Sequence, residues 1–325
     1  MIDFVITWVN GNDPEWIKEY NNFSGSRILE SSRFRDWDNL QYWFRGVEMF
    51  TPWVNNIFFV TWGHIPSWLN INHPKLKIIK HSDFIPSEYL PTFNSHTIEL
   101  NLHRIPGLGQ KFVYFNDDHF ILRQIDPTRF FYKNTPCDMA VLNVLQPNDN
   151  GIDHIQANNI SLINRHFDKR ITIRQNPAIW FNYKYKALLY RTIVLNPWSL
   201  FTGFVDPHMP NAYLKSTFES VWAKEYQTLH NTCNCRLRNL NNVNQYIFRY
   251  WQICNGNIYP INIFNDSKFY QFDDLGVKNI CQEIIKRKSS IICISDTDNI
   301  KFLEAKKQIN DALCLIFPNK SDFER

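Results

Sequence analysis

The stretch KFVYFNDDHF (Lys111–Phe120) carries an apolar run directly into two adjacent carboxylates, Asp117 and Asp118. Two like charges side by side oppose each other's ionisation unless positive charge lies opposite them. Asn and Asp are also common turn formers, so a plain surface turn is the alternative interpretation. The place of this stretch in the fold decides between the two.

Five short apolar runs predict buried strands, at 2–9, 56–62, 76–80, 111–116 and 140–145. They are too continuous to alternate with polar residues, which is expected of parallel strands covered on both faces of a sheet.

Helices are predicted between these strands. Residues 38–50 place large apolar side chains at helical spacing on one face, and Pro52 ends the pattern. A second helix is predicted from Ser95 as N-cap to His103, before the helix-breaking sequence PGLG. The alternation of strand, helix and strand predicts an α/β fold with a Rossmann-like, mostly parallel sheet flanked by helices.

This fold changes the interpretation of Asp117 and Asp118. In open α/β sheets, ligands bind in the crevice outside the carboxyl ends of the strands, where this pair lies. Mg²⁺ and Mn²⁺ prefer carboxylate and phosphate oxygens, so adjacent carboxylates there are suited to a metal that bridges the phosphates of a nucleotide. We therefore predict a divalent metal site at Asp117 and Asp118.

Other candidate residues surround this position. Gly11 would allow a tight turn at positive φ after the first strand, although a plain Asn-Gly turn is the alternative. Arg33 and Arg35 could bind phosphates or form a solvated face. A helix start near Ser95 would present N–H groups to an anion. The candidate donor-binding residues are Trp8, Asn10, Gly11, Arg33, Arg35, Asn94, Ser95, His103, Arg104 and Asn116.

Composition bounds the protein class. The 325 residues are 44% hydrophobic and 16% aromatic, which excludes a disordered chain. A net charge of +4 suits an anionic substrate or a membrane face but is too small to indicate a nucleic-acid-binding protein. The seven scattered cysteines are expected to be free thiols, the start lacks the basic region of a signal peptide, and no apolar run approaches the ~20 residues that span a bilayer. We therefore expect a cytoplasmic protein.

Four blocks of the chain resemble the four successive regions of the Stealth family. They are IDFVITWVNGNDPEW (2–16), the long block RFRD…NDDHF (33–120), DPHMPNAYLKSTFESVW (206–222) and RLRNLNNVNQYIFRYW (236–251). This family contains bacterial capsular polysaccharide phosphotransferases and the catalytic subunit of the animal lysosomal-enzyme N-acetylglucosamine-1-phosphotransferase. The resemblance implies one catalytic domain over 1–325 with a glycosyltransferase-A-like sheet. It is weakest from about 126 to 200, where acceptor-specific structure is expected.

The activity that this resemblance implies is the transfer of a sugar-1-phosphate from a UDP-sugar to a hydroxyl of a cell-surface polysaccharide, with release of UMP. Its implied partners are the UDP-sugar and a polysaccharide or oligosaccharide acceptor, which can be lipid-linked. Mg²⁺ or Mn²⁺ is the implied cofactor. Peripheral association with the inner face of the membrane fits such an acceptor, and no nucleic-acid partner is expected.

The resemblance also implies four catalytic residues: Asp117 and Asp118, His208 from the third block and Arg238 from the fourth. Histidine is a sensible general base because its pKa lies near working pH, and Asp118 is the competing candidate. The chain has Asn10 where bacterial relatives often have Asp, and Asn242 where an acidic residue is common. Two other functions stay open at this point: a metal-dependent glycosyltransferase that releases UDP, and a non-catalytic carbohydrate-binding protein.

Overall fold

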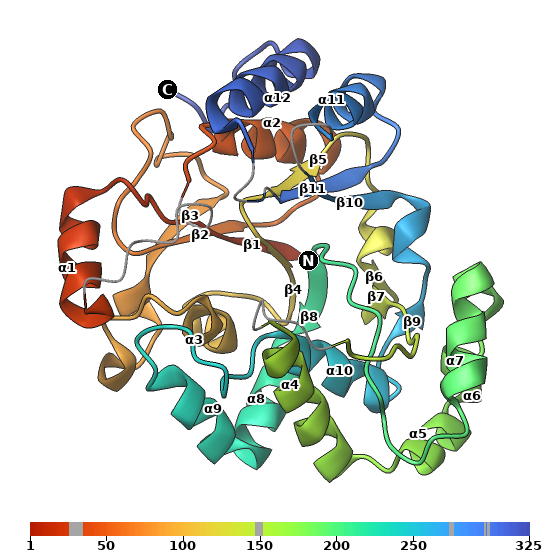
Figure 1. Cartoon of the computed structure of the whole chain (residues 1–325). Coiled ribbons are helices and arrows are strands. Elements are labelled where there is room, and N and C mark those ends of the chain that lie inside the picture. The colour runs from red at the N-terminus through yellow and green to blue at the C-terminus, as the bar shows by residue number, and fades with distance from the viewer. Residues whose placement is uncertain (26–34, 147–151, 273–275, 296, 298–299) are drawn as a thin grey trace.

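A computed structural model describes residues 1–25, 35–146, 152–272, 276–295, 297 and 300–325. Its central sheet is built around β1 (Asp3–Thr7), which pairs in parallel with β2 (Ile57–Thr61) and with β4 (Lys111–Phe115). β3 (Leu76–Lys80) extends the sheet in parallel beyond β2, and β8 (Asn211–Leu214) closes the opposite edge as an antiparallel strand (Figure 1). The predicted α/β class with a mostly parallel sheet is confirmed.

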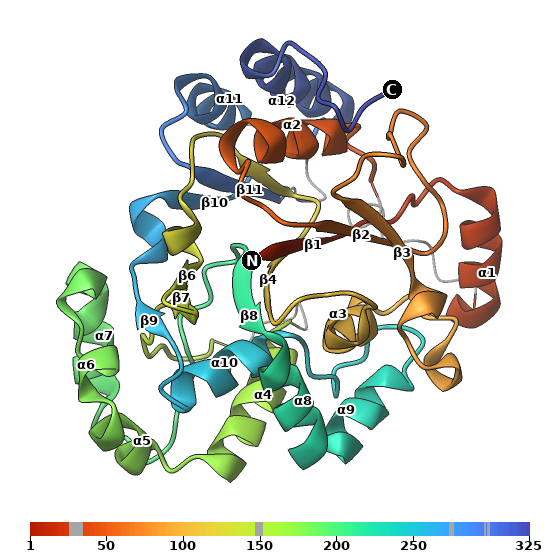
Figure 2. The ribbon, with the colours of Figure 1, turned by 180° about the vertical axis from the view of Figure 1, so that it is seen from behind.

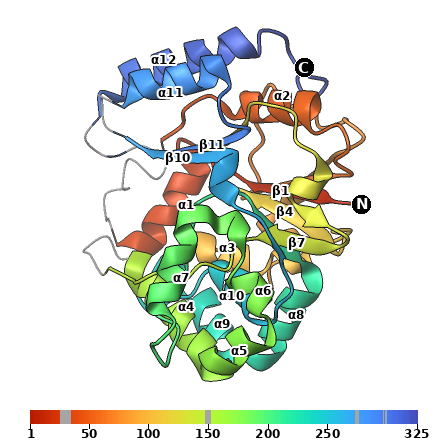
Figure 3. The ribbon, with the colours of Figure 1, turned by 90° about the vertical axis from the view of Figure 1, so that its right-hand side faces the viewer.

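Both faces of this sheet are covered, which explains why its strands read as continuous apolar runs. Phe4 and Ile6 of β1 belong to one core cluster, whereas Val5 belongs to the other. Side chains alternate across a strand, so every position is buried when helices cover both faces. Figure 2, the view from behind, and Figure 3, the side view, show the helices on either side of the strands.

The helices divide between the two faces. On one side lie α2 (Leu40–Phe50), α11 (Val277–Lys286) and α12 (Phe302–Ile316); on the other lie α3 (Ser95–Leu100), α4 (Ile152–His166), α8 (Lys215–Lys224), α9 (Tyr226–Cys233) and α10 (Tyr246–Cys254). The remaining α-helices are α1 (Pro14–Ser24), α5 (Lys169–Gln175), α6 (Pro177–Trp180) and α7 (Leu189–Leu195). None of the described helices is long and apolar enough to cross a membrane.

A second sheet begins where the central one ends. Directly after β4 and the Asp117–Asp118 turn, β5 (His119–Ile121) pairs antiparallel with β11 (Ile291–Ser295), which pairs in parallel with β10 (Ser267–Gln271). The two carboxylates therefore lie at the crossing from one sheet to the other.

α2 packs closely on β5. A Cβ at Gly46 would lie 2.5 Å from the backbone oxygen of Ile121, so only glycine permits this approach. A third small sheet contains β6 (Phe131–Tyr132), β7 (Thr135–Asp138) and β9 (Tyr259–Pro260).

Most predicted elements are confirmed, with two corrections. The strand expected at 140–145 is wrong, because Leu142 forms only an isolated bridge with Phe204 and donates its N–H to the side chain of Thr192 instead of to a neighbouring strand. The N-cap of α3 is Asn94, whose side chain accepts the N–H of His96, and not Ser95. All seven cysteines are free, as expected.

Candidate active site

A cavity of about 530 Å³ lies at the carboxyl ends of β1 and β4. This volume is typical of small-molecule sites, and the position is the one expected for an open α/β sheet. Four further segments also contribute to its walls: α1, the start of α3, the loop of His208 and the loop of Arg238. The predicted site residues that line it are Trp8, Arg35, Ser95, Asn116, Asp117, Asp118, His208 and Arg238.

The Asp117–Asp118 turn lies on this cavity. The backbone of Asp118 is fixed by β11, because its backbone oxygen accepts the N–H of Ile294 at 2.9 Å. Asp117 is open to the cavity, whose walls limit its hydration. This loss of hydration, and then the charge of Asp118, raises the pKa of Asp117 to about 7. Two close carboxylates thus compete for ionisation in the absence of a cation.

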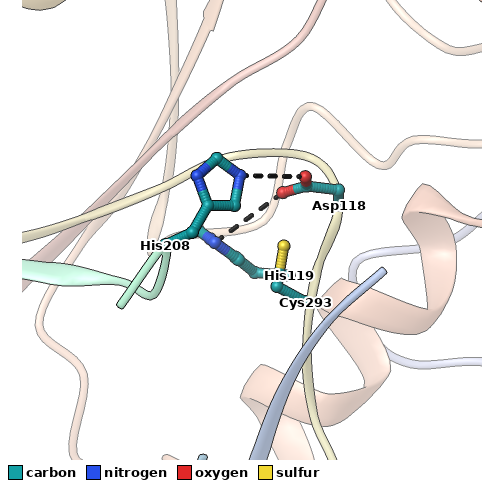
Figure 4. Close-up of side chains that lie close together, drawn as sticks. All are labelled: Asp118, His119, His208 and Cys293. Carbon is teal, nitrogen blue, oxygen red and sulfur yellow. Dashed lines mark ion pairs between the residues drawn. The ribbon is translucent and has the colours of Figure 1, made fainter. Parts of the chain in front are cut away.

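Two histidines and a thiol surround Asp118 (Figure 4). One potential ligand atom from each of Asp118, His119, His208 and Cys293 lies within 4.8 Å of all the others. Nε2 of His208 is 3.5 Å from one carboxylate oxygen of Asp118, and Nε2 of His119 is 3.7 Å from the other. Burial opposes the ionisation of Asp118, but His119 and His208 outweigh it and lower the pKa of Asp118.

The chemistry of this cluster favours an oxygen-ligated ion over a soft metal. His119 accepts the N–H of Asn116 at Nδ1 (3.0 Å), which assigns the ring proton to Nε2, the nitrogen facing Asp118. Burial, and next the charge of Asp118, raises the pKa of Cys293 well above its usual value, so the thiol stays protonated. Oδ1 of Asp118 has no hydrogen-bond partner among the described groups. It is therefore available, with Asp117, to a hard cation.

Among its described lining residues, the cavity holds four acidic and four basic side chains. Its acids are Asp36, Glu99, Asp117 and Asp118, and its cationic or titratable bases are Arg35, Arg238, His81 and His208. His81 is buried, and burial lowers its pKa to about 3, so it adds no positive charge near neutral pH. When all four carboxylates are ionised they outnumber the three remaining bases, and carboxylate oxygens are the ligands that Mg²⁺ and Mn²⁺ prefer. The residues present fit a divalent metal.

Glu99 is a cavity residue to which the sequence analysis gave no role. It lies one turn after Ser95 on α3, is buried, and its Oε2 has no hydrogen-bond partner among the described groups. Burial raises the pKa of Glu99 to about 7, although the nearby Arg238 partly offsets this. The spacing of Ser95 and Glu99, four residues apart on a helix, was the signal that could have revealed it.

Arg238 lies across the cavity wall from this helix. Its guanidinium donates to Oγ of Ser95 at 2.7 Å. Asn94, predicted to bind the donor, is fully buried and holds the Arg238 loop in place: its Nδ2 donates to Oδ1 of Asn242 at 2.9 Å and to the backbone oxygen of Cys235 at 3.2 Å. Asn94 thus supports the wall and does not line it.

An aromatic wall completes the cavity. Trp16 and Tyr20 stack at 5.3 Å between ring centroids, and Phe93 packs edge-on against both. The helix that carries the first two begins at Pro14 and is capped by Asp13, which accepts the N–H groups of residues 15 and 16. None of these three aromatics is among the predicted donor-binding residues, although DPEWIKEY places Trp16 and Tyr20 on one helical face.

Several predicted donor-binding residues lie away from the cavity. Asn10 and Gly11 form the turn after β1, where the N–H of Asn10 donates to His64 at 2.7 Å, and Gly11 is not at positive φ. His103 is buried between Phe218 and Trp222.

The two remaining arginines differ in what the structure describes. Arg104 is exposed, with its guanidinium 4.9 Å from the ring of Trp222, and it does not line the cavity. Arg33 lies outside the described residues.

A buried ion-pair network stands behind His208. Arg249 of α10 is fully buried and binds Asp138 through two of its nitrogens, and its third donates to Asp206 at 2.8 Å. The hydroxyl of Tyr250 also donates to Asp206, two residues before His208. His208 itself has a φ of 47°, so its loop is held in a conformation that few residues adopt freely.

Comparisons with known proteins identify the family of this chain. Residues 2–27 and 33–138 match the models described as "Stealth protein CR1, conserved region 1" and "Stealth protein CR2, conserved region 2". The chain is 42% identical over 332 residues to the capsular polysaccharide phosphotransferase WcwK of Streptococcus pneumoniae, covering 100% of this chain and 98% of that one. The chain belongs to the Stealth family. The predicted resemblance is confirmed.

This Stealth protein is a phosphotransferase, as are its relatives. It is 38% identical to the exopolysaccharide phosphotransferase cps2G of Lactiplantibacillus plantarum (100% and 96% of the two chains). It is 34% identical to the receptor polysaccharide phosphotransferase WefC of Streptococcus gordonii (99% and 98%). Among solved structures, the galactosyltransferase LgtC is 8% identical with a TM-score of 0.40, over 95% of each chain.

Proposed function

We propose that this Stealth protein transfers a hexose-1-phosphate or N-acetylhexosamine-1-phosphate from a UDP-sugar to a hydroxyl of a growing cell-surface polysaccharide. The observation that carries the proposal is the presence of Asp117, Asp118, His208 and Arg238 around one cavity, in a chain whose relatives are polysaccharide phosphotransferases. In this reaction the acceptor oxygen bonds to the β-phosphorus, the bond from that phosphorus to the oxygen bridging the α-phosphorus breaks, and UMP leaves.

Attack at phosphorus depends on positioning and charge neutralisation more than on covalent help from the protein. Arg238, oriented by Ser95, would donate to the donor phosphates, and its planar fork suits two oxygens at once. Asp117 and Asp118 would hold Mg²⁺ or Mn²⁺, and such an ion, when bound, supplies positive charge to the phosphates. His208 would take the proton of the acceptor hydroxyl, with Asp118 or Glu99 as the competing bases.

The leaving nucleotide tests this reaction. The purified chain, supplied with a panel of UDP-sugars, Mg²⁺ or Mn²⁺ and bacterial oligosaccharide acceptors, is expected to release UMP and to give a phosphodiester signal in ³¹P NMR. Release of UDP with no new phosphodiester would show glycosyl transfer instead. Binding without turnover of any sugar nucleotide would leave a carbohydrate-binding protein.

Arg238→Lys is expected to lower kcat/KM by on the order of 10²-fold, the scale of one preorganised electrostatic contact. A lysine keeps the charge but cannot copy a bidentate fork, and it loses the geometry of the bond to Ser95. Arg236→Lys, two residues earlier and outside the cavity lining, is the matched control. Near-normal kinetics for Arg238→Lys in a folded protein would remove Arg238 from the site.

Tyr250→Phe is expected to lower kcat about tenfold, because Asp206 loses the hydroxyl that helps fix the loop of His208. The change also removes a hydrogen bond to a carboxylate, so unfolding free energy should fall by roughly 1.5–3 kcal/mol. Tyr185→Phe is the control, since its hydroxyl donates to Ile179 and it lies outside the cavity lining. A positioning role requires that kcat falls for Tyr250→Phe alone, with the donor KM unchanged in both variants.

We also propose that the region 126–200 serves the acceptor, with residues 126–168 in contact with its sugar part, and that the protein works at the inner face of the membrane. The first proposal rests on the sequence analysis, in which this region resembles the family least. The second rests on the acceptor, because a lipid-linked acceptor would be held at the membrane. Exchange of 126–200 between two relatives with different polysaccharides would exchange acceptor choice if the first is right.

A further inference from the structure

Exposed apolar side chains gather on one ordered part of the molecule. Among the described residues, seven large ones fall within positions 181–200, although single exposed apolar residues are normal elsewhere. The most exposed are Tyr183 (82%), Tyr190 (70%), Leu200 (57%), Trp198 (53%) and Ile193 (52%). These residues belong to α7 and its flanking segments. With α5 and α6 they form what we call the α5–α7 arm, residues 169–200, at one side of the molecule (Figure 1).

Hydrogen bonds and buried aromatic packing hold the parts of the arm together. Nζ of Lys169 in α5 donates to the backbone oxygens of Leu195, Asn196 and Trp198, where α7 ends. This cation satisfies carbonyls that the helix leaves without partners. Trp180 of α6 is fully buried and stacks on Phe201 at 5.7 Å.

The charge of the arm has one sign. The sequence has no Asp or Glu from position 169 to 205, whereas the arm carries six cations: Lys169, Arg170, Arg174, Lys184, Lys186 and Arg191. Of these, Arg170, Arg174, Lys186 and Arg191 are exposed. On α7 itself, Tyr190, Ile193 and Val194 fall on one helical face, and Arg191 flanks it.

We propose that the α5–α7 arm docks this phosphotransferase on an anionic phospholipid surface. Elements that lie at a bilayer interface combine aliphatic residues with Trp or Tyr and with flanking Lys and Arg, and anionic lipids attract the cations. A carbohydrate partner would use the aromatic rings but gives no reason for exposed Ile193, Val194 and Leu200. This proposal extends the proposed function and rests on it for the purpose of docking. A lipid-linked acceptor would be presented at the same membrane surface.

Co-sedimentation of the full chain with lipid vesicles, without any substrate, tests the proposal. Binding is expected to vesicles of phosphatidylglycerol and phosphatidylcholine, to weaken at high salt, and to be absent with phosphatidylcholine alone. The triple change Ile193→Ser, Val194→Ser and Trp198→Ser should weaken binding on the order of 10-fold, and so should Arg170→Glu with Arg174→Glu.

Matched controls lie on the opposite helices. Leu303→Ser with Leu315→Ser removes apolar residues from α12 that are more exposed than those changed in the arm, and Lys278→Glu with Lys286→Glu makes the same charge change on α11. Both controls should bind vesicles as the wild type does. Equal losses in controls and arm variants, or no binding to anionic vesicles at low salt, would overturn the proposal.

Two further measurements separate the alternatives. If the arm is an interface between copies of this chain, the arm variants will change the mass in light scattering and leave vesicle binding intact. If it holds the sugar acceptor, they will lose transfer to a short water-soluble oligosaccharide; lipid docking predicts no change there. Vesicle binding by a chain that releases no UMP from any UDP-sugar would refute the proposed function and leave lipid docking standing.

Discussion

Replacing Asp117 and Asp118 together by asparagine is expected to abolish transfer, with a loss greater than about 10³-fold, because removal of one preorganised electrostatic contact alone costs 10²–10³-fold. Excess EDTA should have the same effect on the wild type, and Mg²⁺ or Mn²⁺ should restore activity to the wild type but not to the variant. UMP release is the readout. The double variant Asp311→Asn with Asp322→Asn, outside the cavity lining, makes the same charge change and should stay active.

Loss of folding does not explain that result, because the carboxylates oppose each other in the metal-free protein. The pKa of Asp117 is raised to about 7 from its ordinary 3.8, so the folded state binds this proton more tightly than the unfolded chain does. Stability is therefore lost as pH rises from about 4 toward 7. In chelator, Asp117→Asn should have a higher Tm than the wild type at pH 8, and the difference should vanish at low pH.

Full activity of the double variant, or of the wild type in excess EDTA, would refute the metal site.

His208→Ala is expected to reduce kcat by about 10²–10⁴-fold, the contribution of a general base, while UDP-sugar affinity changes little. Nε2 of His208 lies 3.5 Å from Asp118 and the side chain is 42% exposed, so the alanine variant creates no cavity in the core. His154→Ala, exposed on α4, is the control. Single-turnover UMP release and calorimetric donor binding separate the two effects.

The pH profile gives a second test of the same base. Burial lowers the pKa of His208, but the hydrogen bond and charge of Asp118 outweigh it and raise the pKa above 6.5. The transfer rate should accordingly fall on the acid side through a group that titrates above the ordinary histidine value. If donor affinity collapses together with turnover, His208 binds the donor, and Asp118 or Glu99 is the base.

Local sequence patterns were sufficient to predict the strands and the position of the two carboxylates at the end of β4. The runs at 2–9, 56–62, 76–80 and 111–116 became β1 to β4 because both faces of the sheet are covered. The run at 140–145 looked the same, but its pairing with residues 202–205 is limited to a single antiparallel bridge, between Leu142 and Phe204, and a few backbone hydrogen bonds. Pairing is a property of two segments, and composition describes only one.

The sequence by itself determined the α/β class, the metal-suited carboxylates after β4 and, through four motif blocks, the family. Only the tertiary structure decided which polar residues share the cavity. It brought Asp118, His208 and Arg238 together from separate segments, buried Asn94 and His103 behind or away from the walls, and added Glu99, Tyr20 and Phe93. The physical reason is that side-chain direction, burial and ion pairing depend on packing between elements distant in sequence, whereas strand and helix patterns are local.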